Sequence, residues 1–279
     1  MAHFLLIVDA QEDSLWYKKA EHFMQSRQRE SCTLMQKILA HSPGLFVIAD
    51  SGVAQEASVH ALFLFSGSVL FPCLPMPPTE LESLLYDFFK TRFVFCVTGE
   101  RTSVKTVEYV LSRLQYAVNE QHDYVFMEYD GNTVIVPPCP VWQCSAMHEA
   151  ELFPLHLGYI REEVMPQNLA VNAAAERLSF SRSVKAQMVF AIKQKSEFVA
   201  KAQTNAATEQ YIQIGGVYTQ QQWRRHGYAS ALVNHLARVI EARQKIPVLF
   251  AKEKNTAALH AYTRAGFVPV GHYRIVYYK

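Results

Sequence analysis

Residues 217–230 read VYTQQQWRRHGYAS, the end of an apolar strand followed by a basic loop and a glycine. Gly227 lets a backbone approach a ligand closely because it has no Cβ, and Arg224 and Arg225 add positive charge. An amphipathic helical pattern follows, from Ala229 to Ile240. The N-terminus of such a helix offers unpaired N–H groups and about half a positive charge. The stretch suits a phosphate-bearing anion, although on its own it equally suits an ordinary basic helix start.

The strand that leads into this loop contains two adjacent glycines. Gly215 and Gly216 lie within the apolar run from Ile212 to Val217. Glycine weakens a strand, and inside one it often marks a bulge or a close backbone approach. The pattern is therefore consistent both with a bulge that faces a ligand and with a bulge that binds nothing.

A second informative stretch, residues 255–267, reads NTAALHAYTRAGF. Asn255 suits a helix N-cap, and Gly266 suits a left-handed helix terminus. Tyr262 follows Ala258 at i+4, so both lie on one face of the helix. A phenol has an ordinary pKa of about 10, close to that of an alkyl thiol, and can protonate a departing thiolate. Taken alone, a tyrosine on a short amphipathic helix is more often a core residue.

In order and spacing, the two stretches resemble the GNAT superfamily of acetyl-coenzyme A-dependent N-acetyltransferases. The resemblance covers about Val141 to Tyr278 and implies an α/β (α+β) fold, with a mixed central sheet flanked by helices. It also implies that the strand ending at Thr219 splays from its neighbour and that pantetheine pairs with main-chain groups exposed there. A main-chain N–H of this strand then polarises the thioester carbonyl, and Tyr262 is the general acid.

The same resemblance implies acetyl-coenzyme A as cosubstrate, with no metal. The basic loop holds the pyrophosphate, the strand before it holds pantetheine through its backbone, and the Asn255 amide contacts the pantetheine arm. The residues implied to bind the cofactor are Val217, Tyr218, Thr219, Arg224, Arg225, His226, Gly227, Tyr228, Ala229, Ser230, Asn255 and Ala258.

The chain departs from the family pattern at the general base. Many members carry a glutamate on the strand before the loop, but here Gln213 lies inside that strand and Glu209 only at its start. Glu162 and Glu163, at the end of a long helical segment, are rival candidates, although such carboxylates are more often solvated surface groups. A water chain can also serve, and no base is needed if the amine arrives neutral.

The N-terminal half echoes the order of strands and helices of the C-terminal half. We place the boundary at the proline-rich segment 137–140, which gives an N-terminal α/β domain at 1–138 and a catalytic domain at 139–279. Residues 118–136 are expected to form two strands around the turn Asp130-Gly131-Asn132. The loop that corresponds to the basic one, residues 72–78, holds four prolines and no arginine or glycine. We expect a tandem of one degenerate and one active GNAT-like domain; the alternative is an unrelated α/β domain.

Composition sets the remaining expectations. The net charge is +2, from 27 basic and 25 acidic residues, so no global field favours nucleic acid or a membrane. Met1 to Asp9 has no basic residues before its apolar stretch and indicates a first strand, not a signal peptide. The five cysteines form no CxxC pair, and Cys139 and Cys144 have no second ligand pair beside them. We therefore expect a cytoplasmic protein with reduced thiols, as a monomer or homodimer.

The predicted function is transfer of an acetyl group from acetyl-coenzyme A to a primary amine by direct attack. The cysteines lie outside both stretches, so no covalent acyl-enzyme is expected. The acceptor is an amine on a small molecule or on a protein. One alternative is a coenzyme A-binding sensor or scaffold with little catalysis. Another is an N-acyltransferase for longer acyl chains, which the 17 Phe and 14 Tyr permit.

Overall fold

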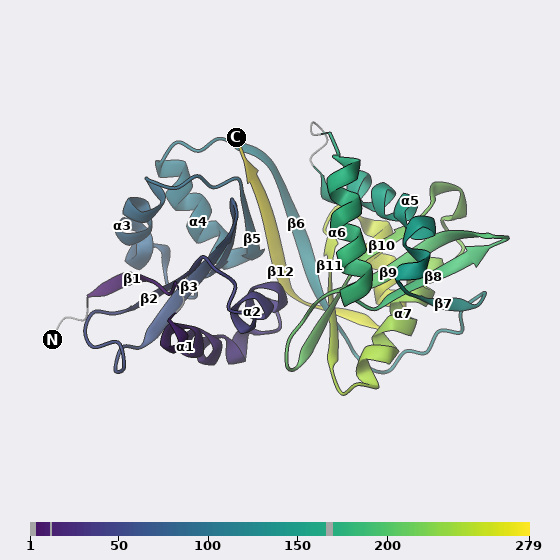
Figure 1. The fold of residues 1–279 in the computed structure, drawn as a ribbon, viewed down its shortest axis with the longest axis horizontal. Helices are drawn as coiled ribbons and strands as arrows, with labels where there is room; N and C mark the ends of the chain where they lie inside the picture. Colours follow the sequence, from purple (N-terminus) through teal and green to yellow (C-terminus); the bar gives the residue numbers. More distant parts are fainter. Residues whose placement is uncertain (1–3, 12, 166–169) are drawn as a thin grey trace. The chain divides into compact units, whose positions relative to one another are not determined.

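The computed structural model describes residues 4–11, 13–165 and 170–279 (Figure 1). It divides the chain into two compact units. Unit 1 comprises Met1–Val125 and Gly271–Lys279, and unit 2 comprises Phe126–Val270. The last nine residues therefore belong with the first half of the chain.

Unit 1 begins with a strand and two helices and continues with three strands, a helix, a strand, a helix and a strand. The expected first strand is present as β1, although residues 1–3 lie outside the described part. The elements are β1 (Leu5–Asp9), α1 (Ser14–Met24), α2 (Cys32–Leu39), β2 (Leu45–Asp50), β3 (Val59–Ser66), β4 (Val69–Cys73), α3 (Pro78–Phe89), β5 (Cys96–Glu100), α4 (Arg101–Arg113) and β6 (Val118–Tyr129).

The sheet of unit 1 has the order β1-β2-β3-β4-β5 and is completed by β12 (Phe267–Tyr278) and β6. The pairs β1–β2, β2–β3, β3–β4 and β5–β12 are antiparallel, whereas β4 and β5 are parallel. Successive side chains of a strand point to opposite faces. Leu45 and Val47 of β2 accordingly pack with α1 and α2, while Phe46 and Ile48 pack with α3 and α4. Helices thus cover both faces of the sheet.

Unit 2 repeats the same order of elements. They are β7 (Val141–Cys144), α5 (Glu149–Tyr159), α6 (Ala173–Ala186), β8 (Val189–Gln194), β9 (Glu197–Ala207), β10 (Tyr211–Thr219), α7 (Tyr228–Glu241), β11 (Ile246–Lys252), α8 (Thr256–Arg264) and β12. Its sheet has the order β7-β8-β9-β10-β11 and is completed by β6 and β12. Helices α5 and α6 pack on one face, with Val189 and Ala191, whereas Phe190 contacts His235 of α7 on the other. The expected tandem of two α/β domains is confirmed.

Two details of the expected organisation differ. The units divide between Val125 and Phe126, within β6, and not at the proline-rich segment. The hairpin expected around Asp130 is wrong: β6 is one strand, and no strand is assigned between Tyr129 and Val141. The reason is the buried Asn234 of α7, whose Oδ1 accepts from the Ile135 N–H at 3.0 Å and whose Nδ2 donates to the Thr133 oxygen at 2.9 Å. Two backbone groups of this segment are therefore bound by a helix side chain instead of a partner strand.

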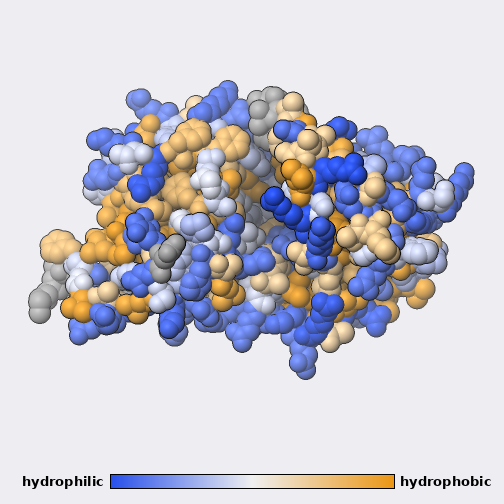
Figure 2. Space-filling model, viewed as in Figure 1, coloured by the Kyte–Doolittle hydropathy of each residue, from blue (hydrophilic) through white to orange (hydrophobic). Residues whose placement is uncertain are grey.

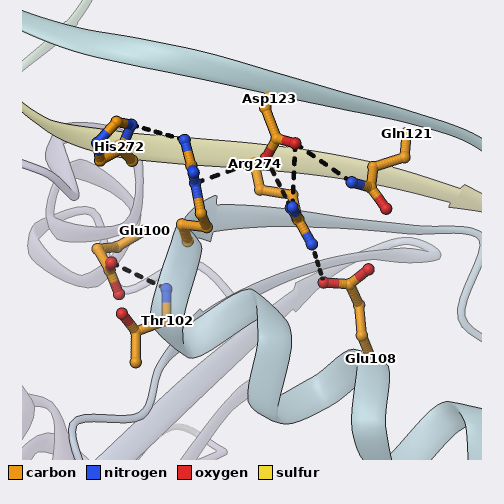
Figure 3. A network of polar contacts seen from close by, with 8 residues as sticks. Glu100, Thr102, Glu108, Gln121, Asp123, His272 and Arg274 are labelled. Atoms are coloured by element: carbon orange, nitrogen blue, oxygen red, sulfur yellow. Dashed lines mark hydrogen bonds and ion pairs between the residues drawn. The ribbon is translucent and has the colours of Figure 1, made fainter.

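A polar network within unit 1 holds the last strand in place (Figure 3). Arg274 of β12 binds both carboxylate oxygens of Asp123 on β6, at 2.8 and 3.0 Å, and donates to Glu108 of α4 at 2.9 Å. Arg101 of α4 lies 2.6 Å from Nδ1 of His272. These charge-assisted contacts tie three elements of unit 1 together and explain why the C-terminus belongs to it.

Candidate functional site

The central parallel strands of unit 2 separate part-way along their length. β10 and β11 pair only over Tyr211–Ile214 and Ile246–Leu249. Beyond this point β10 continues to Thr219 and β11 to Lys252 without a paired register between them. The expected splay after Ile214 is therefore present, and it opens main-chain groups of β10 on the side of β11.

A bulge lies on β10 at the same point. Gly215 pairs with Gln203 of β9 and Tyr218 pairs with Lys201, so three steps on β10 match two on β9. Gly216 has a left-handed φ of 56°, and a Cβ there would lie 3.0 Å from Nζ of Lys201. The peptide that joins Gly216 to Val217 consequently stands outside the paired registers of both neighbouring strands.

The basic loop ends in two left-handed residues before α7. Arg225 has φ 65° and Gly227 has φ 78°, and no atom lies within 4 Å of where a Gly227 Cβ would be. The His226 ring stacks on Tyr228 at 5.6 Å, and the Ser230 hydroxyl donates to the Gly227 oxygen at 3.1 Å. The approach to the helix N-terminus at Gly227 is therefore free of other atoms of the protein.

The guanidinium of Arg224 forms an ion pair with the carboxylate of Glu162. Helix α5 ends in a π-helical turn, Ile160–Val164. From it, Glu162 accepts a bond from the Tyr218 hydroxyl at 2.7 Å and one from Arg224 Nη2 at 2.6 Å. Burial acts to raise the pKa of Glu162, but these bonds outweigh it and lower that pKa. Glu162 is thus a paired anion, and Arg224 contacts it and the Thr219 oxygen.

The neighbouring Glu163 contacts the other side of the splay. Its Oε1 accepts from Asn255 Nδ2 at 3.2 Å, and its Oε2 lies 3.6 Å from Lys252 Nζ. Asn255 also caps α8 as expected, since its Oδ1 accepts from the Ala258 N–H at 3.0 Å. Glu209, the remaining carboxylate considered as a base, is exposed and precedes β10, which begins at Tyr211.

Tyr262 lies on α8 and is 8% exposed. Burial, with a smaller contribution from Tyr159 and Glu163, raises its pKa above the ordinary phenol value. Tyr159 of α5 has a pKa raised to about 12 by burial, and its phenol is hydrogen-bonded to the main chain of Gly216. Gly266 ends α8 with φ 92°, as expected. The structure thus brings Tyr262, Tyr159 and the bulge into one neighbourhood.

Two residues of this neighbourhood were missed by the sequence reasoning, Tyr159 and Lys201. Lys201 is 0% exposed, and Nζ donates to the Gly216 oxygen at 2.9 Å and to Gln203 Oε1 at 3.0 Å. Its signal in the sequence is a lysine in the middle of the strand FVAKAQ, where both faces are buried. Lysine is rarely buried without a specific partner.

The corresponding place in unit 1 is filled by the protein itself. Pro72 belongs to β4 and not to the loop expected at 72–78, and a Cβ on Gly99 of β5 would lie 3.2 Å from its oxygen. The Leu74 N–H donates to Ser103 Oγ of α4 at 2.9 Å, in a buried position. β4 and β5 pair only over Val69–Leu70 and Cys96–Val97, so these strands also separate early, but here the Leu74 N–H has a partner within the protein.

Other sites are not indicated within the described ranges. No group of three or more His, Cys, Asp or Glu side chains is placed to hold a metal ion there. Burial raises the pKa of Cys32, Cys73 and Cys96 to about 12, which leaves inert thiols. None of the described helices is both long and apolar enough to cross a bilayer. On the face shown in Figure 2, strongly hydrophilic residues are interspersed with apolar ones on both units.

Comparison with solved structures agrees with this architecture. A GCN5-related N-acetyltransferase from Sphaerobacter thermophilus is 14% identical and matches 98% of this chain and 94% of its own at TM-score 0.62. A GNAT-family acetyltransferase from Colwellia psychrerythraea is 10% identical, with 99% of each chain covered and TM-score 0.61. A tandem GNAT protein from the clavulanic acid biosynthesis pathway is 9% identical, with 98% of each chain covered and TM-score 0.59.

The chain has a tandem GNAT fold. Residues 190–276 match the family model described as FR47-like protein. The match runs from β8 into β12 and so includes the splay, the basic loop and α8. No curated protein matches the chain in sequence. The GNAT resemblance seen in the two sequence stretches thus holds for the fold of both units.

Proposed function

We propose that this GNAT protein is an N-acetyltransferase that uses acetyl-coenzyme A and acts on a primary amine of a small molecule or a protein. The observation that carries the proposal is the splayed, bulged β10, which ends at an open helix N-terminus and lies beside a buried tyrosine. Each part has a task in acyl transfer from a phosphorylated thioester: anion binding, main-chain pairing and proton donation.

The residues present fit coenzyme A. The N-terminus of α7, with Arg225 and the open Gly227, would hold the pyrophosphate. Main-chain groups of Val217 and Thr219, unpaired toward β11, would hold the pantetheine arm. Arg224 would join the anion site on exchanging Glu162 for phosphate. Acetyl-coenzyme A supplies the activated acetyl group when bound.

Tyr262 would donate the proton to the departing thiolate. Its raised pKa keeps the phenol protonated at neutral pH, which is the state a proton donor needs. The Val217 N–H would stabilise negative charge on the acyl oxygen. Among the carboxylates considered for the base, Glu163 lies near Tyr262 and contributes to its raised pKa. We propose Glu163, or water held by it, as proton acceptor for the amine.

The test is a thermal-shift titration of the whole chain with acetyl-coenzyme A, coenzyme A and dephospho-coenzyme A. Specific binding stabilises the native state by RT ln(1 + [L]/Kd). Gly227→Trp should abolish the shift, because it fills the open approach to α7; Gly227→Ala, strained in the same way but small, should keep most of it. Binding followed by release of free thiol with an amine supports the enzyme. Binding without transfer to any amine would favour the sensor, and no stabilisation of the wild type would refute the cofactor site.

A further inference from the structure

The amine of Lys201 contacts the β10 bulge, which forms part of the proposed acyl site. It comes from the middle of β9, is 0% exposed, and donates to the Gly216 oxygen at 2.9 Å. Its other acceptor is Gln203 Oε1, at 3.0 Å, and Gln203 in turn donates to Ser183 Oγ at 3.0 Å. In the part of the chain that the structure describes, no carboxylate forms an ion pair with this amine.

The bond from Lys201 falls on a particular peptide group. The Gly216 C=O and the Val217 N–H belong to one planar trans amide, so they point in opposite directions. A donor on the oxygen polarises the whole amide, and in a low-dielectric interior such linked hydrogen bonds strengthen one another. Lys201 therefore makes the Val217 N–H a stronger donor on the side facing away from Lys201.

We propose that Lys201 is a positioning residue of the acyl site: its hydrogen bond to the Gly216 oxygen fixes the bulge and strengthens the Val217 N–H as the donor to the acyl oxygen. The inference rests on the proposed function for its catalytic meaning. The polarisation of the Gly216–Val217 peptide follows from geometry alone, because this peptide lies outside the paired registers of β10 with both β9 and β11.

Two aromatic rings lie close to the amine of Lys201. From α5, Tyr159 presents its ring at 5.5 Å and its phenol to the Gly216 main chain, and from α6 Phe180 presents its ring at 5.6 Å. His156 of α5 stacks on Phe180 at 4.3 Å and is paired with Glu176 of α6 at 3.2 Å.

From β10, Tyr218 is the register partner of Lys201, and its hydroxyl is bound to Glu162, which pairs with Arg224. Glu163 lies near the Tyr159 phenol. Burial lowers the pKa of Lys201 to about 7, so the charge of the Lys201 amine beside the bulge changes near neutral pH. The polarisation of the Val217 N–H should change with it.

The chain offers a selective probe of this one peptide. Its sequence contains two Gly–Val pairs, Gly52–Val53 and Gly216–Val217. Labelling glycine carbonyls with 13C and valine nitrogens with 15N therefore gives two correlated NMR signals, and Gly52–Val53 serves as internal control. In the wild type, the Gly216–Val217 signal should follow one titration step centred near pH 7. In Lys201→Met the step should vanish. A step that persists in Lys201→Met, or none in the wild type, overturns the proposal.

Measurements of kcat and of the Kd for coenzyme A distinguish a positioning role of Lys201 from a role in folding alone. With acetyl-coenzyme A and a panel of amines (glycine, spermidine, tyramine, a lysine peptide), Lys201→Met should lower kcat about tenfold and change the Kd for coenzyme A less than about twofold. Lys201→Gln keeps a donor and should restore part of kcat without the titration step. Lys193→Met, on β8, is the matched control and should leave kcat unchanged.

An unchanged kcat in Lys201→Met would refute the role in transfer. If the wild type acetylates none of the amines, the proposed function fails instead, and the NMR titration still decides whether Lys201 polarises the bulge.

Discussion

Replacing Lys201 by Met should change the pH dependence of stability in a way that identifies the buried amine. Burial lowers the pKa of Lys201 from 10.5 to about 7. Between these values the unfolded chain binds a proton that the folded chain does not, so the free energy of unfolding rises with pH. A pKa difference of this size corresponds to about 5 kcal/mol at about 1.4 kcal/mol per pH unit.

The Lys201→Met variant has no amine at this position and so cannot bind this proton. The free energy of unfolding of the wild type, measured relative to Lys201→Met, should therefore rise by about 2 kcal/mol between about pH 7 and pH 9. At pH 7 itself, two opposing effects decide which protein is more stable. The variant removes the cost of burying the amine, but it leaves the Gly216 oxygen and Gln203 Oε1 without a donor, which costs about 1–3 kcal/mol each. Only the ionisation of the amine depends on pH, so the pH dependence separates it from these two effects.

Urea denaturation of both proteins at pH 7, 8, 9 and 10 measures the difference directly. All other ionisable groups are common to both, and His156, whose pKa burial and then Lys201 lower, titrates below this window. Lys193→Met controls for the loss of one lysine from the adjacent strand. Stability curves for wild type and Lys201→Met that run parallel from pH 7 to pH 10 would show that the amine is charged in the fold and that burial does not lower its pKa.

Three further changes test other parts of the molecule. Tyr262→Phe should lower turnover about a hundredfold while coenzyme A affinity, by calorimetry, stays within about twofold; an unchanged rate would remove Tyr262 as the acid. Glu162→Gln should raise coenzyme A affinity about threefold, because it releases Arg224 for the phosphates, and weaker binding would contradict this. Arg274→Met should destabilise the protein by about 1–3 kcal/mol at pH 7, because it leaves Asp123 and Glu108 unpaired. Since Arg274 lowers the pKa of Asp123, that loss should shrink as the pH in urea denaturation falls below 3.8, and a loss independent of pH would argue against the ion pair.

The local parts of the site could be predicted from the sequence. Asn255 caps α8, Gly266 ends it, and Gly227 opens α7 because short-range chemistry dictates each of these. The Gly215-Gly216 pair indicated the bulge for the same reason. Such features need only the residues within a few positions, and the sequence supplies those.

The parts that depend on long-range pairing could not. Lys201 and the bulge meet only because β9 pairs with β10 in one register, and Tyr159 joins them from a helix far along the chain. The turn at Asp130 forms, since the Asn132 N–H donates to Asp130 Oδ1 at 3.0 Å, but no strand directly follows it. Instead Asn234, about a hundred positions away, binds the Ile135 N–H and the Thr133 oxygen. Pairing of this kind is set by tertiary packing, which a single sequence does not reveal.

The place of β12 in unit 1 affects how the chain can fold during synthesis. Residues 273–277 of β12 pair with β5, and they are made only after residues 126–270 of unit 2. Unit 1 therefore waits, with one edge of β5 unpaired, until unit 2 has been made, although most of its residues emerge first. Unpaired strand edges invite aggregation. A nascent chain that ends before β12 should accordingly need a chaperone more than either unit's size suggests, and deletion of residues 271–279 should damage the unit that is made first.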